Sequence, residues 1–202
     1  FQEIREQWVQ RMLQTRRPLH EKMVLFWHGH LASGWPDTRI AENIYNQLNL
    51  FRRMATGSFK ELILAISRDP AMLEYLDNNS NRKGKPNENY ARELMELFTL
   101  GIGHYTEQDI KEAARAFTGW TFVLNEFVFR PLWHDDGVKT FLGKTGNLDG
   151  TDIIDGIFEQ PAAARFLPQI LFEFFAYQAP EESIVDELSG VFKRTSWDVR
   201  SV

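Results

Sequence analysis

Hydrophobic residues recur at helical spacing along most of the chain. In residues 2–16, one face of the expected helix holds Ile4, Trp8, Met12 and Leu13. The spacing predicts further helices at 18–32, 37–54, 59–69, 71–76, 88–101, 107–117, 151–158, 161–177 and 180–193. Ser58, Asp69 and Thr106 are the expected N-caps of the helices that they precede. The helix at 18–32, with the core MVLFWHGHLA, is apolar almost all round and is therefore expected to be buried.

The period changes at Trp120. The run WTFVLNEFVFR places β-branched and aromatic residues on both sides of Asn125-Glu126, which predicts a hairpin. HDDGVKTFLG at 134–143 adds a tight turn at Asp136-Gly137 and a short third strand. The predicted fold class is mainly α: one helical domain over 1–202, with a small antiparallel hairpin or three-strand insert around 120–143.

Composition narrows the class of protein. The 202 residues are 43% hydrophobic, which suits one domain with a sizeable core. A net charge of -5 argues against a nucleic-acid partner, which usually requires a basic face. The absence of cysteine excludes disulfides and thiolate metal sites, and no apolar run is long enough for a transmembrane segment. The chain starts in a helical pattern without Met, so we expect a fragment of a longer protein.

His28 and His30 lie in the buried second helix. Residues two apart on a helix point about 200° apart, so the two rings are expected to face different neighbours. One interpretation is two core histidines bonded to carboxylates or carbonyls. The other is that one or both bind a divalent metal or carry a proton.

The stretch 87–120 combines polar side chains with an apolar pattern. Asn87 is the expected N-cap of the helix at 88–101, and Arg92 is expected to pair with Glu96 on the solvent side. Glu93, in line with Asn89, lies at the edge of the apolar face without such a partner. We expect it to find a tertiary partner, a histidine being the candidate, or to have a raised pKa. A structural ion pair and a general base or metal ligand are both open interpretations.

Polar and aromatic residues also gather near the predicted strands. His134 and Asp135 form a turn that is typical of structure alone, yet they are candidate catalytic groups beside Glu93. Trp120 and Trp133 are candidates for an aromatic platform for a sugar, or else core residues.

The polar loop 77–86 matches part of a calcium-binding pattern. Asp77, Asn79, Asn81 and Glu88 match positions 1, 3, 5 and 12 of an EF-hand loop, but the glycine needed at position 6 is Arg82. The sequence therefore argues against calcium here.

Several long motifs occur together: FWHGH at 26–30, RDPAMLEYLDNNSNRKGKPNENYARELMELFTLGIGHYTEQDIKEAARAFTGW at 68–120, and HDDGVKTFLG at 134–143. With the helices at 151–193, they resemble the bacterial domain-of-unknown-function family numbered 1800; the segment 32–50 matches only loosely. The resemblance implies a helical fold, the central part of a longer protein and, for many members, export from the cell. It implies no activity. The motif positions fall on His28, His30, Asn87, Asn89, Arg92, Glu93, His134 and Asp135.

Two functions fit these observations. The first is a binding or assembly module of an exported bacterial protein, with a buried His/Glu/Asn network and a protein or polysaccharide partner. The alternative is a hydrolase, metal-assisted or not, that acts on an extracellular polymer. It would use Glu93, His134 and Asp135 for catalysis, His28 and His30 for a divalent metal, and Asn87, Asn89, Arg92, Trp120 and Trp133 for binding. The hydrolase requires a histidine nitrogen within about 3 Å of Glu93 or Asp135 in an open cleft.

Overall fold

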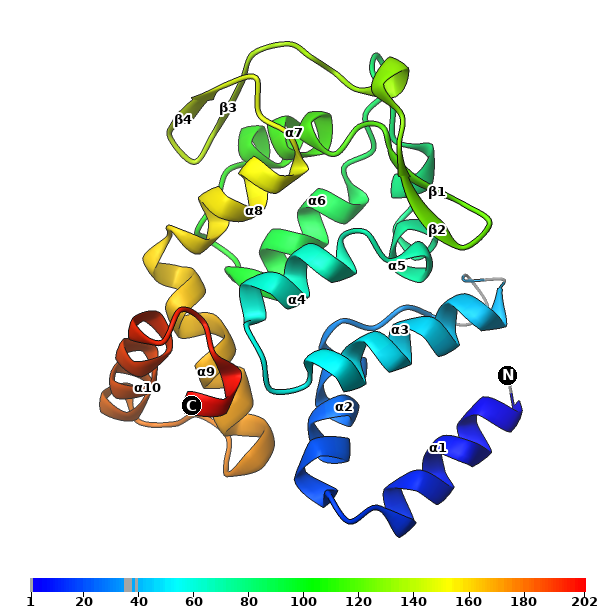
Figure 1. The fold of residues 1–202 in the computed structure, drawn as a ribbon. Helices are drawn as coiled ribbons and strands as arrows, with labels where there is room; N and C mark the ends of the chain where they lie inside the picture. Colours follow the sequence, from blue (N-terminus) through cyan, green and yellow to red (C-terminus); the bar gives the residue numbers. More distant parts are fainter. Residues whose placement is uncertain (1, 35–37, 39) are drawn as a thin grey trace.

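The fold is a set of helices with two small β-sheets at one end (Figure 1). A computed structural model describes residues 2–34, 38 and 40–202. Its α-helices are α1 (Gln2–Gln14), α2 (Pro18–His30), α3 (Ala41–Met54), α4 (Phe59–Ile66), α5 (Pro70–Tyr75), α6 (Asn89–Glu93), α7 (Glu107–Ala116), α8 (Gly150–Phe158), α9 (Pro161–Phe175) and α10 (Glu182–Arg194). The short helical turns are η1 (Asn78–Ser80), η2 (Leu94–Thr99), η3 (Pro131–Trp133) and η4 (Val199–Ser201), and the strands are β1 (Trp120–Val123), β2 (Glu126–Phe129), β3 (Lys139–Phe141) and β4 (Lys144–Gly146). The predicted mainly-α class is confirmed, since the chain is 61% helical.

Local side-chain hydrogen bonds set where several helices begin. Ser58, Asp69 and Thr106 accept hydrogen bonds from the third backbone N–H of α4, α5 and α7, as the sequence predicts. Asp149 caps α8 one residue earlier than the pattern indicates, and forms a capping box with Asp152. These caps satisfy N–H groups that would otherwise lack a partner.

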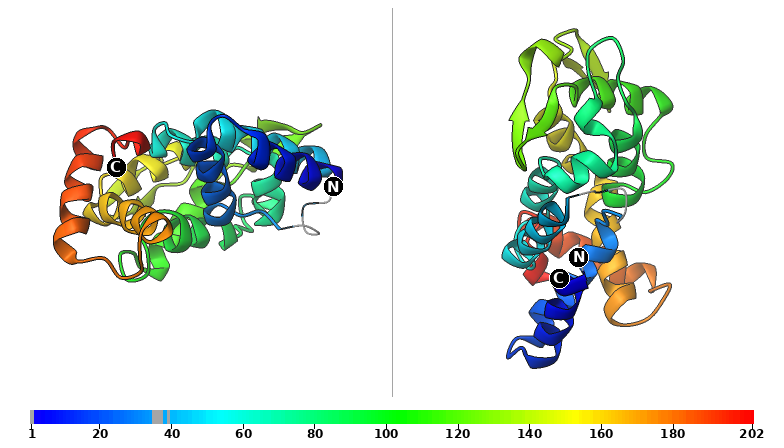
Figure 2. Two further views of the ribbon diagram at one scale, coloured as in Figure 1. Left: turned by 90° about the horizontal axis from the view of Figure 1, so that it is seen from below. Right: turned by 90° about the vertical axis from the view of Figure 1, so that its right-hand side faces the viewer.

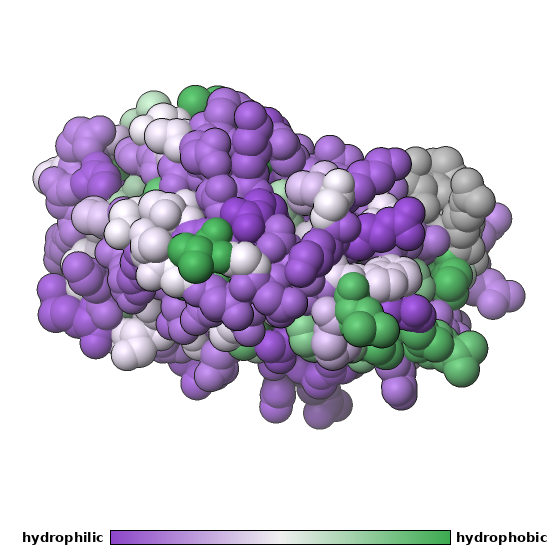
Figure 3. Space-filling view, turned by 90° about the horizontal axis from the view of Figure 1, so that it is seen from above, coloured by the Kyte–Doolittle hydropathy of each residue, from purple (hydrophilic) through white to green (hydrophobic). Residues whose placement is uncertain are grey.

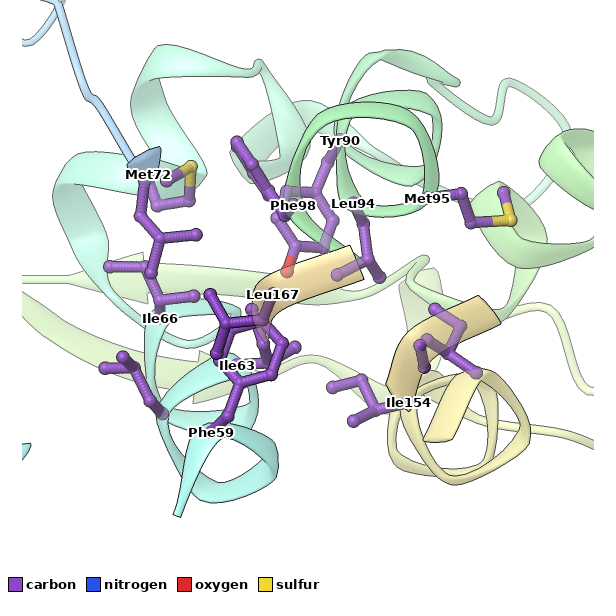
Figure 4. Packing of buried hydrophobic residues seen from close by; sticks show 14 of the residues in the cluster. Phe59, Ile63, Ile66, Met72, Tyr90, Leu94, Met95, Phe98, Ile154 and Leu167 are labelled. Carbon is purple, nitrogen blue, oxygen red and sulfur yellow. The ribbon is translucent and has the colours of Figure 1, made fainter. Parts of the chain in front are cut away.

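The core lies where the middle of the chain meets α8 and α9. Figure 4 shows Phe59 and Ile63 of α4 close to Leu167 of α9, with Tyr90 and Leu94 on the neighbouring helix. All five side chains are fully buried. By contrast, α1 lies at the periphery beside α2 (Figure 2) and has no fully buried residue. The core therefore orders the region of α4 to α9, which holds the candidate residues other than His28 and His30 of α2.

The predicted hairpin is present, and the predicted third strand pairs elsewhere. β1 and β2 are antiparallel, with Trp120 opposite Phe129. Their turn is Leu124-Asn125, one residue before the predicted position, and both residues have positive φ, as a tight hairpin turn requires. β3 pairs with β4, which extends beyond 143, so the insert is two separate two-stranded sheets. Alternating residues cannot reveal which strand pairs with which.

Two helix predictions need correction. The predicted start of the third helix, Asp37, lies outside the described residues; α3 begins at Ala41. The predicted α-helix 88–101 is α-helical only over α6 and continues as a π-helix in η2. There the N–H of Leu100 bonds the carbonyl of Met95, five residues back, at 2.9 Å. Among the described helices, none combines the length and apolar character that crossing a membrane requires.

Candidate functional site

Two buried asparagines tie the polar loop 77–88 to the end of α7 and the start of β1. The Asn81 side chain donates to the Asn78 Oδ1 at 3.0 Å and to the Ala114 carbonyl at 2.8 Å, and its Oδ1 accepts from the Asn87 N–H at 2.9 Å. Asn78 donates onward to the Trp120 carbonyl at 3.2 Å. Asn78 is 1% exposed and Asn81 is 0% exposed. The calcium-like spacing in this loop therefore reflects a structural anchor made of amides.

His134 fastens η3 to the end of α7. Its Nδ1 lies 2.9 Å from the carbonyl oxygen of Thr118, and because a carbonyl only accepts, Nδ1 carries the proton. The Thr118 hydroxyl donates to the Arg115 carbonyl at 2.6 Å and accepts from the Asp135 N–H at 2.8 Å. His134 is 6% exposed and packs edge-on against Phe129. These contacts give the His134 ring a structural role.

Asp135 is held by a bidentate arginine. Its two carboxylate oxygens lie 2.8 and 3.2 Å from the Nε and Nη2 of Arg115, and the Gly137 N–H donates to Oδ1 at 2.9 Å. The hydrogen bonds from Arg115 lower the pKa of Asp135 to about 2. Behind this pair, the buried Lys139 Nζ donates to the carbonyls of Asp135 and Gly137. At neutral pH the Asp135 carboxylate is thus ionised and paired with Arg115, which makes it a poor proton acceptor.

Glu93 stands apart from these networks. It is half-buried, and its carboxylate forms no hydrogen bond or ion pair within the part of the chain that the structure describes. Burial, and then the charge of Glu96, raise its pKa, which is the second of the two outcomes that the sequence predicts. The prediction that a histidine pairs with Glu93 is wrong, because His30 bonds the Phe98 carbonyl and His134 bonds the Thr118 carbonyl.

The other polar residues of α6 serve its N-terminus and its contact with α7. The Asn87 Oδ1 accepts the N–H of Asn89 at 2.9 Å. The helix begins at Asn89 and its N-cap is Glu88, so the predicted N-cap position is one residue too early. The Asn89 amide lies 3.4 Å from Asp77. Arg92 pairs with Glu107 of α7 at 2.9 Å and with Glu88 at 3.3 Å. The predicted Arg92–Glu96 pair is wrong, because Glu96 instead accepts from the Tyr105 hydroxyl at 2.9 Å.

The similarity to known proteins covers this region and the rest of the chain. A family model described as "Protein of unknown function (DUF1800)" matches residues 1–202. The chain belongs to the DUF1800 family. No curated protein and no solved structure matched it.

In this DUF1800 chain, His28 and His30 diverge as helical geometry predicts. His28 is half-buried and packs edge-on against Trp8 of α1, with ring centres 5.1 Å apart. His30 stacks on Phe26 at 5.6 Å, and its Nε2 donates to the Phe98 carbonyl in η2 at 3.1 Å. Burial lowers the pKa of both rings, that of His30 to about 4. The two rings therefore cannot serve one site.

The same geometry argues against a metal centre built from these histidines. Across residues 2–34, 38 and 40–202, no three His, Asp or Glu side chains gather as a group that could hold a metal ion. His30 and His134 each use one ring nitrogen on a backbone carbonyl, which leaves each a single nitrogen for any ligand. These side chains therefore do not form a metal centre by themselves.

The predicted aromatic platform of Trp120 and Trp133 is wrong, because Trp120 is buried in the core. Trp120 is 4% exposed and packs edge-on against Phe117 and Phe127, so it belongs to the core. Trp133 is half-buried, and guanidinium carbons approach its ring: that of Arg130 lies 4.6 Å from the ring centre and that of Arg82 6.0 Å. The indole is therefore engaged by cations.

A cavity of about 430 Å³ lies elsewhere, between α2, α9, α10 and η4. Its lining is mainly apolar, including Met23, Leu171, Phe172 and Ile184, and contains none of the predicted site residues. Sequence reasoning also passed over Thr118, Lys139 and Asn78. A threonine before a glycine, or a lysine in a strand, carries no sequence signal of burial.

Proposed function

We propose that this DUF1800 chain is a helical binding and assembly module whose polar residues brace the framework. The observation that carries the proposal is how His134 and Asp135 are used: the ring bonds a backbone carbonyl, and the carboxylate is bidentate with Arg115. A buried network with its polar groups satisfied fixes helix packing and costs stability when broken. On the family resemblance alone, we place the module in an exported bacterial protein.

The hydrolase alternative rests on Glu93. A half-buried carboxylate with a raised pKa suits a general base or acid. Against it, no histidine nitrogen forms a hydrogen bond with Glu93 or Asp135 among the described residues. A water-activating pair therefore lacks its second member, and the module is the better-supported function.

The test of this proposal is Asp135→Asn. Because Arg115 lowers the pKa of Asp135 from 3.8 to about 2, the folded state gains stability from the ionised carboxylate. This contribution is complete above about pH 4 and is lost as the pH falls toward 2. We expect the variant to lose roughly 2 kcal/mol of unfolding free energy at pH 7, with a smaller loss toward pH 2. Urea unfolding at several pH values measures both.

Asp136→Asn is the matched control. Asp136 is the next residue, its side chain is 68% exposed, and its contact with Lys83 is 3.8 Å long, so we expect little change. A catalytic Asp135 would instead tolerate replacement without loss of stability.

A hydrolytic activity that Glu93→Gln abolishes while unfolding is unchanged would favour the hydrolase. Elemental analysis of the intact protein, purified without chelator, decides whether a divalent metal accompanies it.

A further inference from the structure

A basic and apolar patch lies at the end of the molecule that carries η3. We define it by six residues: Arg82, Lys83, Lys85, Arg130, Leu132 and Trp133. In Figure 1 the loop before α6 and the turn η3 lie together at the upper end of the fold. The Lys83 N–H donates to the Trp133 carbonyl at 2.7 Å, which joins the two segments directly.

The backbone of the patch is well braced. Arg82 and Lys85 form an antiparallel bridge across a tight turn in which Gly84 has φ +80°. The Trp133 N–H donates to the Arg130 carbonyl at 3.0 Å, and the two guanidinium groups lie against the indole. Below the turn, His134 holds η3 to the Thr118 carbonyl. The buried network thus presents the patch on a fixed support.

Positive charge is concentrated here although the chain as a whole carries -5. Arg82, Lys85 and Arg130 form no ion pair with any described residue, and Lys83 has a single contact, 3.8 Å from Asp136. Glu88 lies beside the patch, but its carboxylate pairs with Arg92. Four cations therefore face solvent with one loosely held carboxylate among them.

Apolar side chains project from the same surface. Leu132 is 96% exposed, and Phe129, directly before Arg130, is 44% exposed. Figure 3 looks onto this end of the fold and shows hydrophobic residues gathered near its right-hand edge, on a face that is otherwise mostly polar. Exposed apolar surface that gathers beside basic side chains, as at Leu132, Phe129 and Trp133, marks an interaction site.

We propose that this patch docks the module on an anionic lipid surface, with the cations at the phosphate level and Leu132 and Trp133 in the interfacial region. Basic residues near an anionic bilayer and tryptophan at its interface are the two features that such docking requires. The proposal rests on the proposed function, since it supplies the surface on which the module assembles.

Two other anionic partners fit the patch less well. A sugar polymer would need a free aromatic face, and the Trp133 ring is approached by two guanidinium groups. An acidic soluble protein would satisfy the cations, but Leu132 lies on a projecting turn and not in a hollow. If either alternative were the partner, the protein would not bind vesicles through both the cations and Leu132 in the experiment below.

The experiment is co-sedimentation of the intact protein with vesicles of phosphatidylcholine, either alone or mixed with phosphatidylglycerol. We expect binding only to the mixed vesicles, weakening as salt rises. Arg82→Glu/Lys85→Glu should lower partitioning by more than tenfold, since each basic residue contributes roughly fivefold. Leu132→Ser should lower it roughly tenfold through lost apolar burial.

Matched variants are available on other helices. Arg5→Glu/Lys111→Glu changes the charge by the same amount at exposed positions of α1 and α7, and Leu13→Ser removes a leucine that is 81% exposed. Both should leave binding unchanged.

The proposal is overturned if the protein does not bind mixed vesicles, or if the control variants lose as much binding as the patch variants. Sensitivity to the charge variant without sensitivity to Leu132→Ser would also overturn it, because the attraction would then be electrostatic alone, without the interfacial contact of Leu132 that the proposal requires. None of these outcomes alters the unfolding test of Asp135→Asn, so the two proposals fail separately.

Discussion

Asp69 shows how one residue can serve the fold and still cost stability. It is 6% exposed, and its Oδ1 caps α5 through the Met72 N–H at 3.1 Å and accepts from Gln47 at 2.8 Å. No cation pairs with it within the described ranges, and burial raises its pKa to about 6. The folded state therefore binds this proton more tightly than the unfolded chain does. Stability falls as the pH rises from about 4 to about 6.

Asp69→Asn should remove that cost. Asparagine keeps the Oδ1 that caps α5 and accepts from Gln47, but it cannot ionise. We expect roughly 2 kcal/mol more unfolding free energy at pH 7 and little difference near pH 3. Urea unfolding of both proteins at the two pH values measures it. Asp149→Asn, at the exposed cap of α8, is the control and should bring no gain. Equal stability of Asp69→Asn and the parent at pH 7 would contradict the argument.

His30 also changes protonation in this pH range, so the effect of Asp69 is measured as the difference in unfolding free energy between Asp69→Asn and the parent protein. Burial lowers the pKa of His30 from 6.5 to about 4, so its contribution to stability is complete above about pH 6.5 and is lost as the pH falls toward 4. Asp69 acts with the opposite sign over much of the same window. The two effects partly cancel in the parent profile, and only the difference between the proteins isolates Asp69.

At the scale of elements, the loop 77–88 depends on Asn81 for its position. Asn81→Ala would leave three groups without their side-chain partner in a buried region: the Asn78 Oδ1, the Ala114 carbonyl and the Asn87 N–H. We expect a loss of roughly 3 kcal/mol in unfolding free energy, about one for each hydrogen bond. Thermal unfolding and the rate of proteolysis at 82–85 provide two readouts.

Asn79→Ala is the control for this loop. The structure uses the Asn79 backbone carbonyl, which accepts from the Thr121 hydroxyl at 3.2 Å, and not its side chain. Its replacement should change neither readout by much. If both alanine variants behave alike, the anchor lies in the backbone of the loop and not in the Asn81 amide.

The helix after this loop shows a limit of pattern reading. The periodicity of 88–101 predicts one helix whose inward face is Tyr90, Leu94, Leu97 and Phe98. Tyr90, Leu94 and Phe98 are buried, but Leu97 is 54% exposed, so the predicted face is only partly correct. It cannot predict the π-helix, because that depends on backbone bonds such as Leu100 to Met95 and on His30, which bonds the Phe98 carbonyl from another helix. Tertiary contacts decide the hydrogen-bond ladder.

At the scale of the whole molecule, Gly150 permits α8 to approach α7 and β1. A Cβ at this position would lie 2.6 Å from the Phe117 ring and 2.7 Å from the Trp120 ring. Gly150→Ala should therefore cost roughly 3 kcal/mol, as overpacking of a close-packed core does. Thermal unfolding measures the loss.

Gly29→Ala provides a contrast within α2. A Cβ there meets nothing within 4 Å, and the position is mid-helix, so alanine should stabilise by about 0.5–1 kcal/mol. Opposite signs for the two glycines would show that packing, and not helix propensity, governs Gly150. A gain in stability for Gly150→Ala would contradict the close approach of these elements.

The sequence by itself determined the mainly helical class, most helix boundaries, the hairpin at 120–129 and the caps at Ser58, Asp69 and Thr106. These features are local, because apolar spacing and side-chain caps act within a few residues along the chain. It also determined the family, since long motifs in a set order do not need a structure to be read.

Only the tertiary structure decided what the polar residues do. His134 reaches Thr118, Asp135 reaches Arg115, and Asn81 reaches Ala114 across 16 to 33 residues of sequence. Glu93 fails to find the histidine expected of it, because His30 bonds the Phe98 carbonyl instead. Hydrogen bonding in a buried region depends on which groups the fold brings within about 3 Å, and residue types and spacing do not encode that distance.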